Sequence, residues 1–530
     1  MQTDYIIIGA GTAGCLLANR LSEDGANVLL LEAGPRAWHP MIHIPAGVRS
    51  LHRNPRVNWN FMTEPDPGIN GRTMHWPRGK VIGGSGSING MLYVRGNPGD
   101  YDGWAQSGCT GWGYSDVLPY FKMSESYARG DDRYRGKSGP MIVEDYRTVL
   151  PLTHRFVEAA CASGIPMTTD YNGAQQEGVG YSQMTRLGRF RGSTASTFLA
   201  QARGRANLRI ETRAQVTKLL IESGRCAGVL YRQNGVDRTL RAEREVILSA
   251  GSIKSPQLLQ LSGIGPAAHL KSLGIEVVHG LPGVGANLSD HYVGFTAFRV
   301  KEETSINELA RGWRLGREVL RWIFSADGAL TFGVTSSTVF TRSREGLLRP
   351  DLQLLFTPAS YDQSRFGELE KVPGVTVAVC AVQPQSRGTV MARSNDPFAP
   401  PAIRPNYLSS PADLQAILAG MRRVRAIFAQ PPMAKHCVEE TLPGARAQSD
   451  EEIASVVRKT GTTIYHPVGT CKMGLDPMAV VDPRLRVHGI AGLRVVDASV
   501  MPMVTTGNTN APTVMIAEKA AAMIREDKGR

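Results

Sequence analysis

Residues 5–14 read Tyr5-Ile-Ile-Ile-Gly-Ala-Gly-Thr-Ala-Gly14, an apolar, β-branched run that enters three glycines spaced Gly-x-Gly-x-x-Gly. Residues 15–21 continue with a helical pattern, so the expected order is strand, tight turn and helix. In that order Gly9 permits the turn, Gly11 lets the backbone approach a phosphate, and Gly14 lets helix and strand pack closely. The stretch predicts a dinucleotide-binding βαβ unit whose helix N-terminus faces a pyrophosphate. A glycine-rich turn in an ordinary βαβ unit is the alternative.

A second apolar run over residues 26–31 ends at Glu32, 18 residues after Gly14. This is the tip of the second strand of the unit, where a carboxylate can accept a hydrogen bond from an adenosine ribose hydroxyl. Its charge would repel a 2′-phosphate, which argues against NADP. FAD and NAD share the fingerprint. Residues 78–90 hold five more glycines and could approach a phosphate or a flavin ring, although alone they read equally well as a flexible linker.

Composition excludes several classes of protein. The chain has 530 residues, 42% of them hydrophobic, which indicates a globular protein of several units. Seven cysteines without a CxxC pair argue against a disulfide framework or a cysteine-built zinc site, so we expect no metal and a cytosolic setting. The N-terminus shows no export signal. The charge-free run 498–517 contains Pro502 and Pro512, which disqualify it as a membrane span.

Positive charge is unevenly distributed. The net charge is +13, and residues 186–244 hold 13 basic and four acidic residues. Nucleic acid is therefore a partner to consider. The basic residues alternate with strand-like runs such as 207–210 and 216–221, and no nucleic-acid-binding motif accompanies them. We expect a solvated surface or the steering of an anionic partner, and no nucleic acid.

Further motifs follow in order along the chain. They are residues 79–89 continuing to Tyr93-Val-Arg-Gly96 and Asp102, residues 251–265, His466-Pro-Val-Gly-Thr-Cys-Lys-Met473, and residues 496–502 running into 507–512. Together with the N-terminal fingerprint, these motifs make the chain resemble, over nearly its full length, the glucose-methanol-choline (GMC) oxidoreductases, most closely the bacterial choline-dehydrogenase-like and sorbose-dehydrogenase-like members.

The resemblance implies an α/β fold, α+β overall, with a Rossmann-like FAD-binding domain and a second, substrate domain built on an antiparallel sheet with helices. It implies a discontinuous division of the chain. The FAD-binding domain takes residues 1–145, 206–290 and 456–530, and the substrate domain takes residues 146–205 and 291–455.

One FAD per chain is implied, together with the residues that hold it. Some relatives tether the flavin through a histidine directly before the asparagine of the second glycine loop, and here that position is Ile88, so we expect non-covalent FAD. The implied cofactor-binding residues are Gly9, Gly11, Gly14 and Glu32 for the ADP part, Val216 by the adenine, and Gly83, Gly84, Asn89, Met91, Asp497, Ala498 and Thr509 at the flavin.

The implied reaction is the oxidation of an alcohol to a carbonyl compound. Such a reaction removes a hydroxyl proton and moves a hydride to flavin N5, so it needs a base within hydrogen-bond reach. His466 is the candidate, and Pro467 restricts the backbone that aims its ring. The second catalytic position of the family matches Asn508, whose amide can stabilise a developing alkoxide but cannot act as a base. Asn510 is the alternative for that position.

The substrate is indicated by a single position rather than by a motif. In choline-oxidising relatives a glutamate holds the quaternary ammonium, and a loose alignment places Ser336 there. We therefore expect a primary alcohol or polyol as substrate, oxidised by a dehydrogenase. The alternatives are an oxidase that uses O2, a hydroxynitrile-lyase-like use of the same scaffold without redox chemistry, and a flavin-holding protein without turnover. The oligomeric state has no signature in the sequence.

Residues 309–324 predict one amphipathic helix. Leu309, Trp313, Gly316, Leu320 and Phe324 share one face, and four arginines share the other, at positions 311, 314, 317 and 321. A basic amphipathic helix with a tryptophan can lie on an anionic membrane, where a quinone acceptor is found. The alternative is an ordinary surface helix. We expect a cytoplasmic protein that could touch the inner membrane face, with quinone or O2 as electron acceptor.

Overall fold

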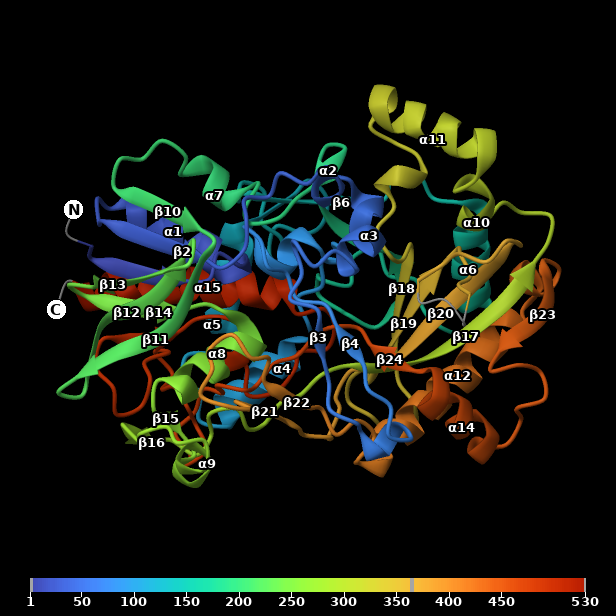
Figure 1. The fold of residues 1–530 in the computed structure, drawn as a ribbon. Coiled ribbons are helices and arrows are strands. Elements are labelled where there is room, and N and C mark those ends of the chain that lie inside the picture. Colours follow the sequence, from blue (N-terminus) through green and yellow to red (C-terminus); the bar gives the residue numbers. More distant parts are fainter. Residues whose placement is uncertain (1–2, 363–366, 529–530) are drawn as a thin grey trace.

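The computed structural model describes residues 3–362 and 367–528, as a mixture of helices and strands built around two large sheets (Figure 1). The ends of the predicted segments 1–145 and 456–530, and a short stretch of 291–455, lie outside the described residues.

A five-stranded parallel sheet carries the N-terminal motif. Its order is β10-β2-β1-β14-β25, and every pairing is parallel. β1 is central and all four of its side chains are buried, as expected of a strand covered on both faces. The strands come from three distant parts of the chain: β1 (Tyr5–Ile8), β2 (Val28–Glu32), β10 (Leu208–Thr212), β14 (Glu245–Leu248) and β25 (Leu493–Val495).

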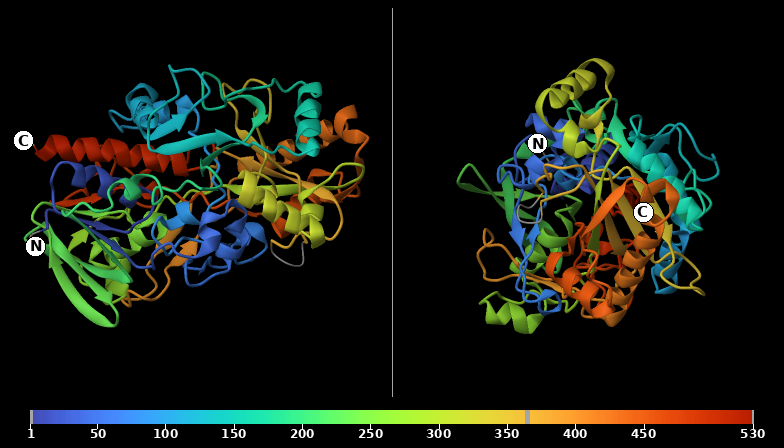
Figure 2. Two further views of the ribbon diagram at one scale, coloured as in Figure 1. Left: turned by 90° about the horizontal axis from the view of Figure 1, so that it is seen from above. Right: turned by 90° about the vertical axis from the view of Figure 1, so that its right-hand side faces the viewer.

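Helices from both ends of the chain close this unit. α1 (Thr12–Glu23) follows β1 and packs against α15 (Asn510–Lys528), and the Arg20 guanidinium pairs with Glu518 at 2.7 Å. Figure 2 shows α15, in red, beside the N-terminal elements in dark blue. α8 (Gly251–Leu261) follows β14. The expected Rossmann-like unit is confirmed, and the helix expected after β1 is longer at both ends than residues 15–21.

A seven-stranded sheet forms the core of the second part. Its order is β23-β17-β20-β19-β18-β7, with β24 also on β17, and the pairings are antiparallel. The strands are β7 (Gly178–Tyr181), β17 (Tyr292–Val300), β18 (Ser337–Thr341), β19 (Leu352–Thr357), β20 (Gly374–Ala381), β23 (Cys437–Leu442) and β24 (Thr462–Thr463). Helices α6 (Pro151–Ala162), α12 (Pro411–Phe428), α13 (Pro431–Ala434) and α14 (Asp450–Thr460) accompany it. β24 comes from the predicted segment 456–530, and the domain boundaries themselves stay a prediction.

Smaller elements surround the two sheets. β11 (Ala214–Glu222), β12 (Arg225–Gln233) and β13 (Val236–Arg241) form a meander, and β5 (Glu125–Tyr127), β6 (Met141–Asp145), β8 (Gln183–Leu187) and β9 (Phe190–Arg191) form a four-stranded sheet. Shorter elements are α2 (Pro40–His43), α3 (Val48–His52), β3 (Phe61–Met62), β4 (His75–Trp76), α4 (Pro98–Gln106), α5 (Tyr114–Ser124), α7 (Phe198–Gln201), β15 (Ile264–Gly265), α9 (Ala267–Ser272), β16 (His279–Gly280), β21 (Thr389–Met391) and β22 (Ala402–Arg404). Short 3-10 turns are η1 (Pro45–Gly47), η2 (Pro67–Ile69), η3 (Gly84–Ser87), η4 (Ala329–Thr331) and η5 (Ala498–Val500).

The single helix predicted over residues 309–324 is wrong at its start. α10 (Ile306–Leu309) ends where the predicted helix begins, and α11 (Gly312–Ser325) starts three residues later. Arg311 has extended backbone angles and Gly312 has φ +53°, so the chain turns between the two helices. Leu309 is buried and does not share a face with Trp313.

A buried ion network fixes the four-stranded sheet beside the second glycine loop. The Glu125 carboxylate accepts hydrogen bonds from Arg95 at 2.6 Å and from Arg135 at 2.8 Å, and all three side chains are buried. Arg135 also donates a hydrogen bond to the side-chain oxygen of Gln183 on β8, at 3.0 Å. The backbone carbonyl oxygen of Gln183 in turn accepts a hydrogen bond from the Tyr93 amide. The network therefore joins residues 93–95 to β8.

We predict that Glu125→Gln destabilises the protein by about 3 to 5 kcal/mol, because it leaves two buried guanidinium groups without full compensation. The matched control is Glu222→Gln, which removes an exposed partner of Arg241 and should cost less than about 1 kcal/mol. Thermal unfolding followed by circular dichroism should give a midpoint several degrees lower for the first variant only. Equal midpoints would contradict a structural role for the network.

Candidate active site

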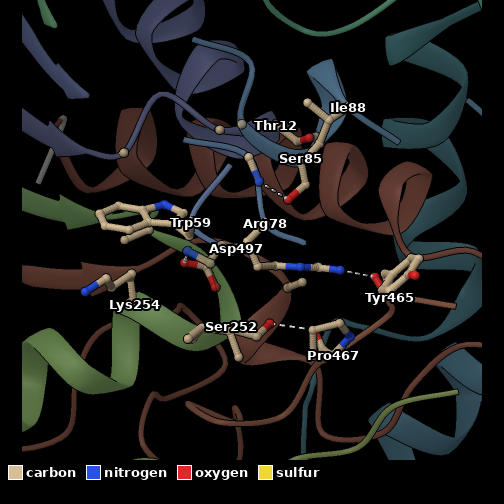
Figure 3. Close-up of a pocket in the computed structure, with 18 of the residues that line it drawn as sticks. Thr12, Trp59, Arg78, Ser85, Ile88, Ser252, Lys254, Tyr465, Pro467 and Asp497 are labelled. Carbon is tan, nitrogen blue, oxygen red and sulfur yellow. Dashed lines mark hydrogen bonds between the residues drawn. The ribbon is translucent and has the colours of Figure 1, made fainter. Parts of the chain in front are cut away.

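A cavity of about 380 Å³ lies between the parallel and the antiparallel sheets. One end is lined by Gly9, Gly11 and Glu32, and the other by His466 and Asn508. The second glycine loop runs along its side. A volume of this order is typical of ligand sites, and the lining joins the dinucleotide fingerprint to the candidate base. Figure 3 shows Thr12, Ser85 and Ile88 on one side of it, with Ser252, Lys254 and Pro467 on the other.

The first glycines make close backbone contacts. Gly9 has φ +95°, and a Cβ on Gly14 would lie 1.9 Å from the Gly9 carbonyl oxygen, so strand and helix touch through main chain. Gly11 precedes α1, whose N-terminus has neither a capping side chain nor an acidic residue in its first turn. Free amides and the positive end of the helix dipole therefore face the cavity, which suits a pyrophosphate. Gly14 does not line the cavity, in keeping with its packing role.

Glu32 ends β2 and lines the cavity, as does Val216. Its two carboxylate oxygens accept hydrogen bonds from the amides of Ala10, at 2.9 Å, and Gly34, at 2.8 Å. Burial raises the pKa of Glu32 to about 7. Each oxygen keeps a lone pair. The carboxylate is thus fixed in place and can still accept a hydrogen bond from a ribose hydroxyl.

The second glycine loop lies directly on the first. A Cβ on Gly84 would be 2.7 Å from the Gly11 Cα. Gly83 does not line the cavity. Its amide donates a hydrogen bond to the Ala10 carbonyl oxygen at 2.7 Å, which anchors the second loop to the first. Asn89 and Met91 do line it. The Asn89 side chain accepts hydrogen bonds from the Met91 amide, at 3.0 Å, and from Arg191, at 2.8 Å.

The C-terminal segment holds the remaining residues that the resemblance assigns to the cofactor. The buried Asp497 carboxylate accepts hydrogen bonds from the Gly251 amide, at 2.8 Å, and from the Ser255 hydroxyl, at 2.6 Å. It therefore ties the end of β25 to the start of α8. Ala498 and Thr509 line the cavity beside it. Two glycine loops, a helix N-terminus, a ribose acceptor and this segment therefore share one cavity, and their chemistry fits the parts of FAD.

His466 and Asn508 meet at the far end of the cavity. The Asn508 amide nitrogen lies 3.0 Å from His466 Nε2. The His466 amide donates to Asp290 at 2.7 Å, and His466 Nδ1 lies 2.9 Å from Nδ1 of His291. Asn510 instead accepts a hydrogen bond from Thr12 at 2.9 Å. Of the two asparagines considered for the second position, Asn508 is therefore the one beside the histidine.

The hydrogen-bond pattern assigns the protons of both histidines. His291 Nε2 lies 3.2 Å from the Val382 carbonyl oxygen, which can only accept. The proton of neutral His291 is then on Nε2, and its Nδ1 accepts from His466 Nδ1. His466 Nε2 consequently carries a lone pair, to which the Asn508 amide donates. This lone pair faces the cavity, as a base requires.

The surroundings of His466 keep it neutral. Burial, His291 and Arg78 together hold the pKa of His466 well below its usual 6.5. Burial likewise lowers the pKa of His291 to about 4. Near neutral pH both rings are therefore uncharged, and His466 is ready to take a proton.

Several contributing residues lay outside the sequence prediction. Asp290, His291, Arg78, Tyr465 and Arg191 all fix the site, and Figure 3 shows Arg78 reaching the Tyr465 carbonyl oxygen, at 2.7 Å. For Arg78, the only indication in the sequence of a role at the site was its position directly before the motif of residues 79–89. No sequence pattern pairs residue 291 with 466, because they are brought together by the tertiary fold.

The substrate side of the cavity is apolar. Val334, Leu355 and Ile464 line it. Ser336 is buried with its hydroxyl 2.8 Å from that of Thr153 and lies outside the cavity lining. Among the described residues, the carboxylates that line the cavity are Glu32 and Asp497, which both accept backbone amides. Within the same residues, no group of three His, Cys, Asp or Glu could hold a metal ion.

Comparisons with known proteins place this geometry in a family. The family model of GMC oxidoreductases matches residues 3–293 with its N-terminal part and residues 384–517 with its C-terminal part. The chain is 45% identical to an alcohol dehydrogenase [acceptor] of Pseudomonas putida over 98% of this chain and 95% of that protein. It is equally 45% identical to an oxygen-dependent choline dehydrogenase of Sinorhizobium fredii over 98% and 95%.

A solved structure agrees over the whole length. The formate oxidase of Aspergillus oryzae, solved in a study of FAD modification, superposes with a TM-score of 0.93, at 27% identity, over 99% of this chain and 98% of that one. The chain belongs to the GMC oxidoreductase family of FAD-dependent enzymes that act on alcohols.

Proposed function

We propose that the protein oxidises a neutral primary alcohol or polyol, with His466 as the base and Asn508 as the donor to the alcohol oxygen. The observation that carries this proposal is the His466 Nε2 lone pair, held 3.0 Å from the Asn508 amide at the boundary between the cofactor loops and an apolar wall. A hydroxyl that enters here meets an acceptor for its proton and a donor for its oxygen.

The residues of this chain would divide the work as follows. The alcohol hydroxyl takes the place of the Asn508 amide at Nε2 and gives its proton to that nitrogen. The Asn508 amide then donates to the oxygen and stabilises its developing negative charge. His291 keeps the proton on Nδ1 of His466, so that the ring does not turn. Bound FAD supplies the acceptor for the hydride that leaves the adjacent carbon.

The lining supports a neutral substrate over a cation. Val334, Leu355 and Ile464 offer no negative charge, and Ser336 stands away from the cavity. The relatives do not decide the substrate, because the alcohol dehydrogenase and the choline dehydrogenase are equally similar. The relatives named above are an alcohol dehydrogenase and a choline dehydrogenase, which supports redox chemistry over the lyase-like alternative.

We further propose a dehydrogenase that passes electrons to a quinone-type acceptor, with O2 as the alternative, in the cytoplasm. The name of the Pseudomonas putida relative supports a dehydrogenase, and that of the Sinorhizobium fredii relative, an oxygen-dependent choline dehydrogenase, supports the alternative acceptor. All seven cysteines are unpaired, which supports a reducing compartment. No helix among the described residues is long and apolar enough to cross a bilayer.

The first prediction from this site is that FAD is not covalently attached. Ile88 is buried at the position where some relatives carry the tethering histidine, and an aliphatic side chain offers no nucleophile. Precipitation of the yellow protein with acid should release the flavin into the supernatant. Flavin that stays with the washed precipitate would show another attachment residue.

The second prediction concerns the base. His466→Ala should leave FAD bound but slow flavin reduction by alcohol roughly 10² to 10⁴-fold, the usual contribution of a positioned base. Asn508→Ala should cost less, because His466 still takes the proton, and Asn510→Ala should cost least. Anaerobic bleaching of the flavin by a panel of alcohols measures all three. Bleaching of the wild-type enzyme by no alcohol in the panel would overturn the proposed function.

The third prediction concerns pH. His466 acts in its neutral form, so the rate of flavin reduction rises with pH through its pKa and is flat above it. Because that pKa is well below 6.5, the wild-type rate should be flat from pH 6.5 upward. His291→Leu removes the acceptor for Nδ1 and a neighbour that lowers the pKa. The variant should reduce the flavin more slowly, and the pH below which its rate falls should be higher than in the wild type. A purely structural defect would leave that pH unchanged.

A further inference from the structure

Helix α11 turns its apolar side chains away from the protein. Trp313, Leu320 and Phe324 are 72%, 54% and 79% exposed, and Leu315 and Ile323 are exposed beside them. The buried residue of the helix is Glu318, whose carboxylate accepts a hydrogen bond from the Ala329 amide at 2.8 Å. A surface helix normally buries its apolar stripe and exposes its charges. α11 has the reverse orientation.

Specific contacts hold the helix in this orientation. Arg321 pairs with Glu318 at 3.3 Å and with Asp327 at 3.2 Å, on the side that faces the protein. The Trp322 ring donates to the Arg189 carbonyl oxygen at 3.1 Å and packs edge-on against Phe190. Figures 1 and 2 show α11, in yellow, standing out from the body of the molecule.

We propose that the outward face of α11 docks the protein on the surface of an anionic lipid bilayer. Residues 306–325 hold four arginines against two glutamates, and Glu308 and Glu318 are each paired with an arginine. The chain as a whole carries +13. Tryptophan and phenylalanine on an apolar face, with arginines around it, are the composition of helices that lie in the plane of a membrane interface.

A second copy of the chain fits this face less well. A helix of 14 residues is about 21 Å long and about 10 Å wide, so its outward strip covers roughly 200 Å². A stable protein interface needs about 800 Å² on each partner. A bilayer needs no complementary flat surface, because lipids adapt to a single convex helix.

The docking face is connected to the substrate side of the cavity. The chain leaves α11 and reaches Val334, which lines the cavity and touches Gly90 of the second glycine loop. Docking would bring that wall close to the lipid surface, where apolar alcohols and quinones dissolve. The docking itself does not depend on the reaction, so it can be tested separately.

Flotation of the FAD-loaded, full-length protein with vesicles tests the proposal. Vesicles of equal parts phosphatidylcholine and phosphatidylglycerol should carry the wild-type protein, and phosphatidylcholine alone should bind it more weakly. The double variant Trp313→Ser with Phe324→Ser should bind about ten- to a hundredfold more weakly, because two large apolar side chains no longer enter the interface. Arg317 is half-exposed and lies 3.5 Å from Glu318, which keeps its pairing with Arg321 when Arg317 is replaced, so Arg317→Gln should weaken binding to the anionic vesicles about fivefold.

The matched control replaces two exposed apolar residues elsewhere. Leu475 and Val438 are 67% and 60% exposed, and Leu475→Ser with Val438→Ser should leave vesicle binding unchanged. Alcohol-dependent bleaching in solution should be the same in all these proteins, which separates this test from that of the proposed function. Equal flotation of the wild type and the Trp313 and Phe324 variant would overturn the proposal. A second outcome would also overturn it: light scattering that shows a dimer for the wild type and a monomer for this variant, with no vesicle binding by either protein.

Discussion

Main chain lies directly on main chain where the second glycine loop crosses the first, and the cavity is built on that contact. A Cβ on Gly84 would lie 2.7 Å from the Gly11 Cα, and one on Gly34, which follows β2, would lie 1.9 Å from the Lys80 carbonyl oxygen. No side chain larger than hydrogen fits at these crossings. The loop can therefore approach the edge of the parallel sheet closely enough for its amides to line the same cavity as the helix N-terminus.

This close crossing fixes one wall of the site, and the antiparallel sheet supplies the other. His291 directly precedes β17, whereas His466 follows β24, which pairs with β17. The two histidines, 175 residues apart, meet because those strands are neighbours. The proton arrangement of the base is thus a product of the sheet. The carbonyl of Val382, just after β20, sets the tautomer of His291, and His291 sets that of His466.

The sequence allowed much of the fold to be predicted. The strand that enters Gly9, the helix that follows it and the position of Glu32 at a strand tip all agree with the structure, since local periodicity and turn residues determine them. His291 and Arg191 were missed because their partners are distant in the chain. The pattern of residues 309–324 identified two faces, but it could not show which face the protein covers. That choice is made by the pairing of Glu318 with Arg321 and the Ala329 amide.

The charges around the cavity agree with a neutral substrate that becomes negative as it reacts. Arg78 lines the cavity, donates to the carbonyl oxygen of Tyr465 next to His466 and helps to lower the pKa of His466, so a positive charge lies near the base. Glu32 and Asp497 already accept backbone amides. A quaternary ammonium would enter a site with more positive than available negative charge. A developing alkoxide, in contrast, meets the Asn508 amide and a newly protonated His466, and both favour the charge that the reaction creates.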